Sequence, residues 1–326
     1  MEATSSASSN RPVTQVQPRT WGLLDIFLRW LLFATLAGSC GAWHWLLDLF
    51  SHFRWYYFVI SLIWIIVICR SNRRRSKWCL GLVLIWNGGL LWPYYAPVTR
   101  TPVSASATTV SLVSMNVYTA NQNKPAVVDY LRDRQPDLVI VMEVDQKWAE
   151  ALQPIGDLYP YRFIQPRPDN FGIGLLSKWP LIEPRFVEFA DTQLPNIVTR
   201  IEYAGHVFQL VATHPLPPIG ATRADERNSQ LRELGDFVKR SSLPTIVAGD
   251  LNATPWSVAF RDIVSRSSLR DSALGLGVQG TWNAKTWIRI PIDHALIPPD
   301  MTVVRRSVGP DVGSDHFPLE VTVAFP

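Results

Sequence analysis

The sequence predicts an α/β domain over residues 110–326, preceded by a membrane segment of three apolar helices. Beyond residue 110, short apolar runs alternate with charged amphipathic stretches, which is the pattern of strands and helices in an α/β fold. Before residue 98, three apolar runs follow one another with Trp and Tyr near their ends, as in membrane helices. We therefore expect four parts: a disordered Ser/Thr/Pro-rich tail (1–20), a membrane domain (21–98), a linker (99–109) and a globular domain (110–326).

The membrane helices are expected from three uncharged runs of 18, 15 and 21 residues, at 30–47, 55–69 and 78–98. A bilayer core requires about 20 helical residues. Flanking Arg and aromatic side chains extend the shorter runs, which places the spans at about 26–47, 53–69 and 78–97. Three such runs in succession disfavour the alternative of buried helices in a soluble core.

The charge of the loops predicts the orientation of these helices. The loop at 70–77 contains five basic residues, whereas the loop at 48–54 contains one. Because basic loops stay in the cytoplasm, the N-terminus is expected inside and the chain after residue 98 outside. This topology predicts a multi-pass protein of the plasma membrane with an extracytoplasmic globular domain.

Charge and cysteine content limit what the globular domain does. Residues 1–100 hold 10 basic and 3 acidic residues, whereas residues 101–326 hold 21 and 24, so the globular part has a net charge of −3. This balance offers no net positive charge for a nucleic acid, which makes nucleic acid the less favoured partner. All three Cys precede residue 80, which excludes disulfides, thiol nucleophiles and zinc–thiolate sites from this domain.

The elements of the globular domain follow from periodicity. Strands are expected at 110–116, 137–143, 171–176, 197–213 (with a turn at Gly205), 243–248 and 319–324. Amphipathic helices are expected at 125–134 and 222–240.

Polar residues stand where several of these strands end: Asn116, Glu143, His214, Asp250 with Asn252, Asp293, and Asp315 with His316. Ionisable groups are less costly at a strand end than in its middle, and together they line a common cleft. A divalent cation would compensate the charge of Glu143, which directly follows a buried strand. Local alternatives remain open: Asn116 as a turn cap, His214 as an ordinary loop residue, and Asp250 with Asn252 as an Asx-turn.

The motifs at these positions resemble the endonuclease/exonuclease/phosphatase superfamily, which includes pancreatic deoxyribonuclease, apurinic endonucleases, sphingomyelinases and inositol polyphosphate phosphatases. They are Ser114-Met115-Asn116, Met142-Glu143, Thr213-His214, Gly249-Asp250-Leu251-Asn252, Asp293 and Ser314-Asp315-His316. The resemblance covers about residues 110–326 and, with the preceding apolar runs, is closest to bacterial membrane-anchored members. It implies a four-layer α-β-β-α sandwich and a metal-dependent hydrolase acting on phosphoric ester or pyrophosphate bonds.

The resemblance also implies residue roles. Glu143, Asn116 and Asp315 would form the metal site for Mg²⁺, or for Mn²⁺ in its place. His316, held by Asp293, would act as general base or as electrostatic partner of the phosphorus, and Asp250 would orient or deprotonate the attacking water. Asn252 and His214 would donate to the phosphate. Whether Asp250 or His316 is the base stays open. Arg223 and Arg227 either contact the anionic substrate or lie on a solvated helix face.

These inferences favour a membrane-anchored phosphoesterase. Its substrate would be a phosphorylated, lipid-linked molecule at the outer face of the lipid bilayer, with polyprenyl pyrophosphate preferred. Two alternatives remain: a surface nuclease or phospholipid phosphodiesterase, and a non-enzymatic membrane scaffold with a degenerate site. No protein partner is expected.

Overall fold

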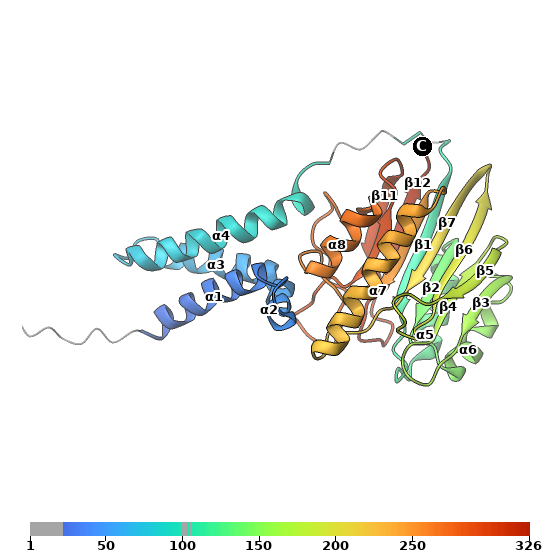
Figure 1. Cartoon of the computed structure of the whole chain (residues 1–326), viewed down its shortest axis with the longest axis horizontal. Helices are drawn as coiled ribbons and strands as arrows, with labels where there is room; N and C mark the ends of the chain where they lie inside the picture. Colours follow the sequence, from blue (N-terminus) through green and yellow to red (C-terminus); the bar gives the residue numbers. More distant parts are fainter. Residues whose placement is uncertain (1–21, 99–102, 105) are drawn as a thin grey trace, which may run out of the picture.

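The computed structural model describes residues 22–98, 103–104 and 106–326 (Figure 1). The expected tail at 1–20 lies outside the described residues, as do 99–102 and 105 of the expected linker. The N-terminal helices extend away from the rest of the protein in Figure 1. They are α1 (Leu23–Ser39), α2 (Trp45–Leu49), the 3₁₀ helix η1 (Phe50–Phe53), α3 (Arg54–Val67) and α4 (Arg74–Tyr95). Residues 23–95 are called the helical unit below.

The three spans predicted at 26–47, 53–69 and 78–97 are not supported as such. In the part of the chain that the structure describes, one helix, Trp45–Val67, is long and apolar enough to cross a membrane by length and composition. The first predicted span is broken because α1 ends at Ser39. There the chain turns back closely: a Cβ on Gly38 would lie 2.8 Å from the Ser51 nitrogen. The third run is less apolar than it first appears, since it contains Asn87, two following glycines and Pro93.

Two six-stranded sheets form the centre of the remaining part of the protein. The first has the order β11-β12-β1-β2-β4-β3, and the second has the order β5-β6-β7-β8-β10-β9. The strands of the first sheet are β1 (Thr109–Asn116), β2 (Leu138–Met142), β3 (Tyr161–Gln165), β4 (Ile173–Ser177), β11 (Thr302–Val308) and β12 (Leu319–Ala324). Those of the second are β5 (Ile182–Val187), β6 (Asn196–Tyr203), β7 (His206–Thr213), β8 (Thr245–Asp250), β9 (Arg270–Asp271) and β10 (Asp293–Ile297).

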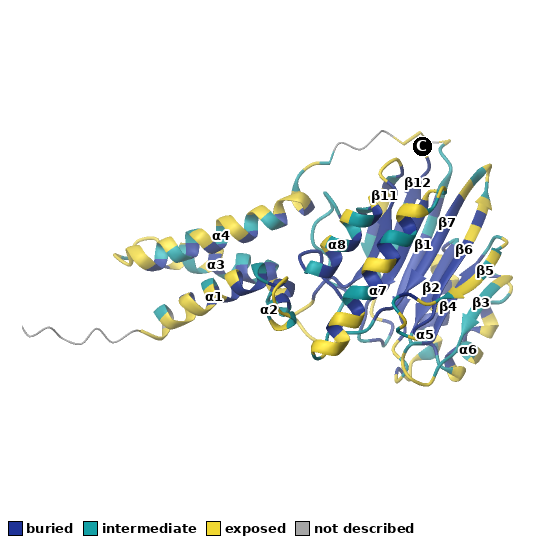
Figure 2. Ribbon diagram, in the orientation of Figure 1, coloured by how far each residue is buried: buried dark blue, intermediate teal, exposed yellow. Residues whose placement is uncertain are grey.

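Three apolar clusters hold these elements in four layers. The central cluster lies between the sheets and joins residues of both, such as Ile140 and Leu210. A second cluster packs α5 (Lys124–Arg134), α6 (Gln146–Ala151) and the 3₁₀ helix η2 (Gln153–Ile155) on the first sheet. A third packs α7 (Ala221–Arg240) and α8 (Val258–Ser267) on the second sheet. The α/β prediction is therefore right, and the layers form the sandwich that the motifs implied. The sheets are buried, whereas the long N-terminal helices expose much of their surface (Figure 2).

Periodicity located most of the interior elements and missed several others. The expected helices at 125–134 and 222–240 correspond to α5 and α7, and the expected 197–213 run is the hairpin of β6 and β7. β3, β5, β9, β10, β11, α6 and α8 were not predicted. β5 is an edge strand whose residues are partly exposed, so its sequence has no strict alternation of apolar and polar residues.

The strand directions bring the polar residues of the sequence analysis to one edge of the sandwich. β1 and β2 are parallel neighbours in one sheet, and β7 and β8 are parallel neighbours in the other. β10 runs antiparallel to β8, with Asp293 paired to Asp250. The C-terminal ends of four strands and the start of a fifth therefore meet, because parallel strands end at the same side of a sheet.

Gly249 permits the close approach of β7 and β8 at this edge. A Cβ on Gly249 would lie 1.8 Å from the carbonyl oxygen of Thr213. We expect Gly249→Ala to lower the free energy of unfolding by about 3 kcal/mol, because the overlap is with backbone that cannot rotate away. Gly205→Ala is the control: its φ is also positive, but no atom lies within 4 Å of the added Cβ, so about 1 kcal/mol is expected. Thermal unfolding measures both, and equal losses would contradict the overlap argument.

Candidate active site

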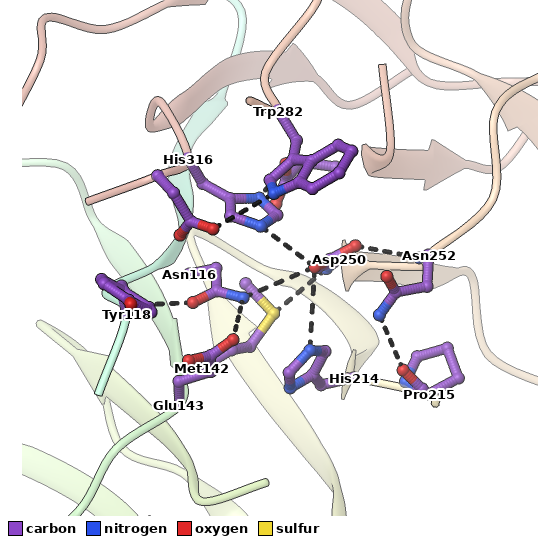
Figure 3. A network of polar contacts seen from close by, with 12 residues as sticks. Asn116, Tyr118, Met142, Glu143, His214, Pro215, Asp250, Asn252, Trp282 and His316 are labelled. Atoms are coloured by element: carbon purple, nitrogen blue, oxygen red, sulfur yellow. Dashed lines mark hydrogen bonds and ion pairs between the residues drawn. The ribbon is translucent and has the colours of Figure 1, made fainter. Parts of the chain in front are cut away.

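Six elements position the polar residues at this edge. Asn116 ends β1, Glu143 follows β2, His214 follows β7, Asp250 ends β8 and Asp293 begins β10. His316 lies three residues before β12. Figure 3 shows Asn116, Glu143, His214, Asp250 and His316 pointing toward one another across the two sheets. The structure therefore brings together residues that are up to 200 positions apart in the sequence.

Asp250 occupies the centre of the group, between two histidines. Its Oδ2 lies 3.7 Å from Nε2 of His214 and 3.6 Å from Nε2 of His316. The other ring nitrogen of His316, Nδ1, is 2.9 Å from Oδ2 of Asp293. His316 is thus held between two carboxylates, one at each ring nitrogen, and the Asp293 contact fixes the orientation of its ring.

The charges of these residues depend on burial and on one another. Burial opposes the charged form of His316, but the Asp293 and Asp250 carboxylates outweigh it and raise its pKa to about 10. Burial raises the pKa of Asp250 to about 7, although His316 acts in the opposite direction. Burial, with the nearby His316 charge, lowers the pKa of His214 to about 4. The two histidines therefore differ: His316 favours the charged form and His214 the neutral form.

Glu143 is fixed by hydrogen bonds on both carboxylate oxygens. Oε1 accepts from the Asn116 side-chain amide at 2.9 Å, and Oε2 accepts from the Thr119 backbone N–H at 3.2 Å. Its backbone is in the left-handed region, with φ of 61°, which is uncommon for a residue with a side chain and is concentrated at functional sites. Burial raises the pKa of Glu143 overall, although both hydrogen bonds favour the ionised form.

Asp315 lies close enough to Glu143 that its charge also raises the pKa of Glu143. Its Oδ2 accepts from Nε1 of Trp282 at 3.1 Å, whereas its Oδ1 is buried without a hydrogen-bond partner. Two carboxylates close together, one with an unsatisfied oxygen, fit a divalent cation that binds oxygen ligands. The Asn116 Oδ1 accepts from the Tyr118 N–H and retains a second lone pair. The three residues predicted as the metal site therefore have the chemistry to hold Mg²⁺.

A second group of metal-ligating atoms overlaps the histidine pair. One ligand atom from each of Asp250, Asp293 and His316 lies within 4.8 Å of the others. Within this group, His316 and Asp293 already bond to each other. A hard cation prefers oxygen ligands, which Glu143, Asn116 and Asp315 offer without a ring nitrogen.

Asn252 adopts the turn that the sequence left open as an alternative. Its backbone N–H donates to Oδ1 of Asp250 at 2.9 Å, which is an Asx-turn, and its φ is 48°. Its side-chain amide donates to the Pro215 carbonyl at 2.9 Å. Because the amide nitrogen carries two hydrogens, it can donate a second hydrogen bond.

Arg227 is not a surface residue and differs here from its predicted role as a substrate contact. It is 1% exposed, and its guanidinium donates to the Asn252 carbonyl at 2.7 Å and to Oδ2 of Asp48 at 3.4 Å. Helix periodicity turns it inward, toward the helical unit, whereas Arg223 lies exposed on the first turn of α7. Arg227 therefore supports the Asn252 turn from behind.

Sequence reasoning did not predict the contact of Trp282 with Asp315 or that of Thr119 with Glu143. Trp282 reaches Asp315 from 33 positions away, and Thr119 also donates its hydroxyl to the Glu143 carbonyl at 2.9 Å. Neither residue is ionisable or follows a buried strand, so neither had a signal in the pattern that located the other residues.

Comparison with known proteins agrees with this geometry. The model of the Endonuclease/Exonuclease/phosphatase family matches residues 113–316, which include all of the residues placed at the site except Asp48. No curated protein matches the chain in sequence.

Solved structures share the fold. D. rerio TDP2 in complex with a single-strand DNA product is 20% identical with a TM-score of 0.57, covering 66% of this chain and 99% of TDP2. The human Nocturnin catalytic domain with bound sulfate is 19% identical with a TM-score of 0.56, covering 67% and 95%. A double mutant of beta toxin from Staphylococcus aureus with bound magnesium ions is 18% identical with a TM-score of 0.52, covering 67% and 100%. From its strand-end motifs, its two-sheet fold and the family model that spans them, the chain belongs to the Endonuclease/Exonuclease/phosphatase family.

Proposed function

We propose that the protein is a membrane-anchored, Mg²⁺-dependent phosphoesterase that hydrolyses a phosphate ester or pyrophosphate of a lipid-linked substrate at the outer face of the plasma membrane. The observation that supports it best is the contact between the active-site edge and the helical unit. Asp48 in α2 forms an ion pair with Arg227, and the Arg227 guanidinium donates a hydrogen bond to the Asn252 carbonyl. One side chain therefore separates the helical unit from a turn of the site.

The surface of the helical unit supports its immersion in lipid. α1 exposes Leu23, Ile26 and Phe33, α3 exposes Ile63 and Ile66, and α4 exposes Leu82 and Ile85. Large apolar side chains on several helices form a surface that water disfavours and lipid does not. The basic residues at 70–77 lie at the end of α3 and α4 remote from the sheets (Figure 1). With basic residues inside, the sandwich is outside.

The residues of the site then have separate tasks. Asp250 orients the attacking water and accepts its proton, and His316, which favours the charged form, acts as the electrostatic partner of the phosphorus. Asp293 fixes the ring of His316 through the 2.9 Å contact at Nδ1. Asn252 and His214 donate to the phosphoryl oxygens, and His214 has a buried Nδ1 without a hydrogen-bond partner. This set provides the aligned water and the oxygen donors that phosphoryl transfer requires.

Glu143, Asn116 and Asp315 would hold the Mg²⁺, which neutralises charge on the phosphoryl group when it is bound. Asn116 also keeps the Glu143 carboxylate in place through the 2.9 Å hydrogen bond. Trp282 does the same for Asp315.

A substrate panel tests the proposal. Purified full-length protein in lipid vesicles is offered polyprenyl pyrophosphate, phospholipids, and single- and double-stranded DNA, with Mg²⁺, with Mn²⁺ and with EDTA. We expect phosphate release from the lipid pyrophosphate, its loss in EDTA and its return with Mg²⁺. Glu143→Ala is assayed in parallel because it lacks the main proposed metal ligand. Any activity that this variant retains in full comes from a contaminant.

Other outcomes assign other functions. Cleavage of DNA that rises steeply as salt is lowered, and is absent in Glu143→Ala, would identify a nuclease instead. Release of a phospholipid headgroup would identify a phosphodiesterase. If no substrate is turned over, and Glu143→Ala binds metal as the wild type does, the protein would be identified as a non-enzymatic scaffold.

A further inference from the structure

The loop at 283–289 exposes apolar side chains directly beside the active site. Trp287 is 98% exposed and Ile288 is 56% exposed. Exposing a whole Trp to water is costly, and such side chains mark interaction surfaces. Neither side chain has a role in the chemistry described above, so their exposure requires another explanation.

The base of the loop is rigid and joined to the site. Trp282 and Ile290 face each other as a short antiparallel bridge, which closes the loop. On one side, the Ala284 N–H donates to the Asp315 carbonyl at 2.7 Å. On the other side, the Arg289 guanidinium lies 4.5 Å from the ring centre of Phe317. The tip is therefore held at a fixed place on the rim of the site.

The same loop is bonded to the helical unit. The Tyr56 hydroxyl donates to the Arg289 carbonyl at 2.9 Å and accepts from the Arg289 N–H. Tyr56 is in the first turn of α3, within Trp45–Val67, the one helix among the described residues that is long and apolar enough to cross a membrane. The level of the loop along this helix is thus fixed by two hydrogen bonds.

Aromatic residues of the helical unit lie at the same end of this helix as the loop. Trp43, Trp92 and Tyr95 are exposed at the end of the helical unit nearest the sheets, and Trp55 donates to the Tyr95 hydroxyl at 2.9 Å. Trp and Tyr gather where a membrane protein passes from hydrocarbon to headgroups. The basic residues of 70–77 lie at the opposite end of the same helices. The aromatic end is therefore the outer headgroup level, and Tyr56 ties the loop to it.

We infer that Trp287 and Ile288 insert into the outer headgroup region of the lipid bilayer and hold the rim of the active site against the membrane surface. The inference rests on the membrane placement in the proposed function and adds the surface by which the site meets its lipid. A Trp ring suits this region because it is apolar with one polar N–H. A headgroup phosphate beside the loop then needs to move only a short way to reach the site.

The experiment measures depth in the membrane and needs no turnover. Full-length protein with Cys40, Cys69 and Cys79 replaced by Ser carries a single nitroxide at Ile288→Cys, in phosphatidylcholine vesicles. Val207→Cys is the matched control, an exposed aliphatic position at the start of β7, remote from the strand ends that form the site. Ile85→Cys on α4 reports the hydrocarbon region. We expect the 288 label to be protected from a water-soluble nickel quencher at least fivefold relative to the 207 label.

Each result decides the inference. Equal quenching at 288 and 207, with the 85 label protected, overturns the loop inference and leaves the membrane placement intact. Quenching at all three positions overturns both. Protection at 288 that grows with protein concentration at fixed lipid assigns the loop to a contact between two copies, and also overturns the inference. Protection in a protein that hydrolyses no lipid phosphate supports the loop inference and removes the proposed substrate.

Discussion

Asp250→Asn is expected to lower kcat by about 10²- to 10⁴-fold, the usual loss when a positioned general acid or base is removed. Asp250 lies within 4 Å of a nitrogen of both His214 and His316. Asparagine keeps the shape but loses the negative charge, so it neither accepts a proton from water nor balances the charged His316. The loss is therefore expected in kcat with the Mg²⁺ requirement retained.

Hydrolysis of the substrate identified in the panel measures this loss in vesicles. Asp262→Asn is the control, since it removes a carboxylate that pairs with Arg266 on the surface of α8. The thermal midpoint is expected to change little in Asp250→Asn, because Asp293 still pairs with His316 and the amide oxygen can still accept from the Asn252 N–H. A kcat within twofold of the wild type would show that His316 or another group is the base.

Asp48→Ala is expected to lower the free energy of unfolding by about 3–5 kcal/mol, because it leaves Arg227 buried without its carboxylate. Asp48 is 4% exposed and Arg227 1% exposed. The second carboxylate oxygen, Oδ1, accepts from the Val258 N–H at 2.9 Å, at the start of α8. The substitution therefore removes two contacts between the helical unit and the sandwich. The thermal midpoint should fall by about 6–20 °C for a domain of this size.

The double variant Asp48→Ala/Arg227→Met separates stability from activity. Replacing both members of a buried ion pair with apolar residues is often neutral, so much of the stability should return. Activity should stay reduced, since Met no longer donates to the Asn252 carbonyl. A midpoint for Asp48→Ala equal to that of the wild type would mean that the helical unit and the sandwich do not depend on this pair.

The N-terminal third shows where pattern and structure diverge. Hydropathy found the apolar runs but not the turn after Ser39, because that turn depends on Gly38 and Gly41 fitting against residues 48–51. Asp48 was expected in the loop between the first two spans, yet it is buried against Arg227, 179 positions away. Local patterns do not reveal such contacts, since each partner looks solvent-exposed in its own segment.

The sequence alone determined the α/β class, most of the inner strands and the polar residues at their ends, because buried strands are short apolar runs and ionisable groups avoid their interiors. It also placed Asp315 and His316 side by side and predicted different partners for them. Only the tertiary structure decided which atoms meet: Asp315 contacts Trp282, His316 lies between Asp293 and Asp250, and Arg227 supports Asn252 from behind. These contacts arise from the packing of the two sheets and the helical unit. Their geometry depends on the register of strand pairing and on how the helical unit packs against the sandwich, and local sequence periodicity specifies neither.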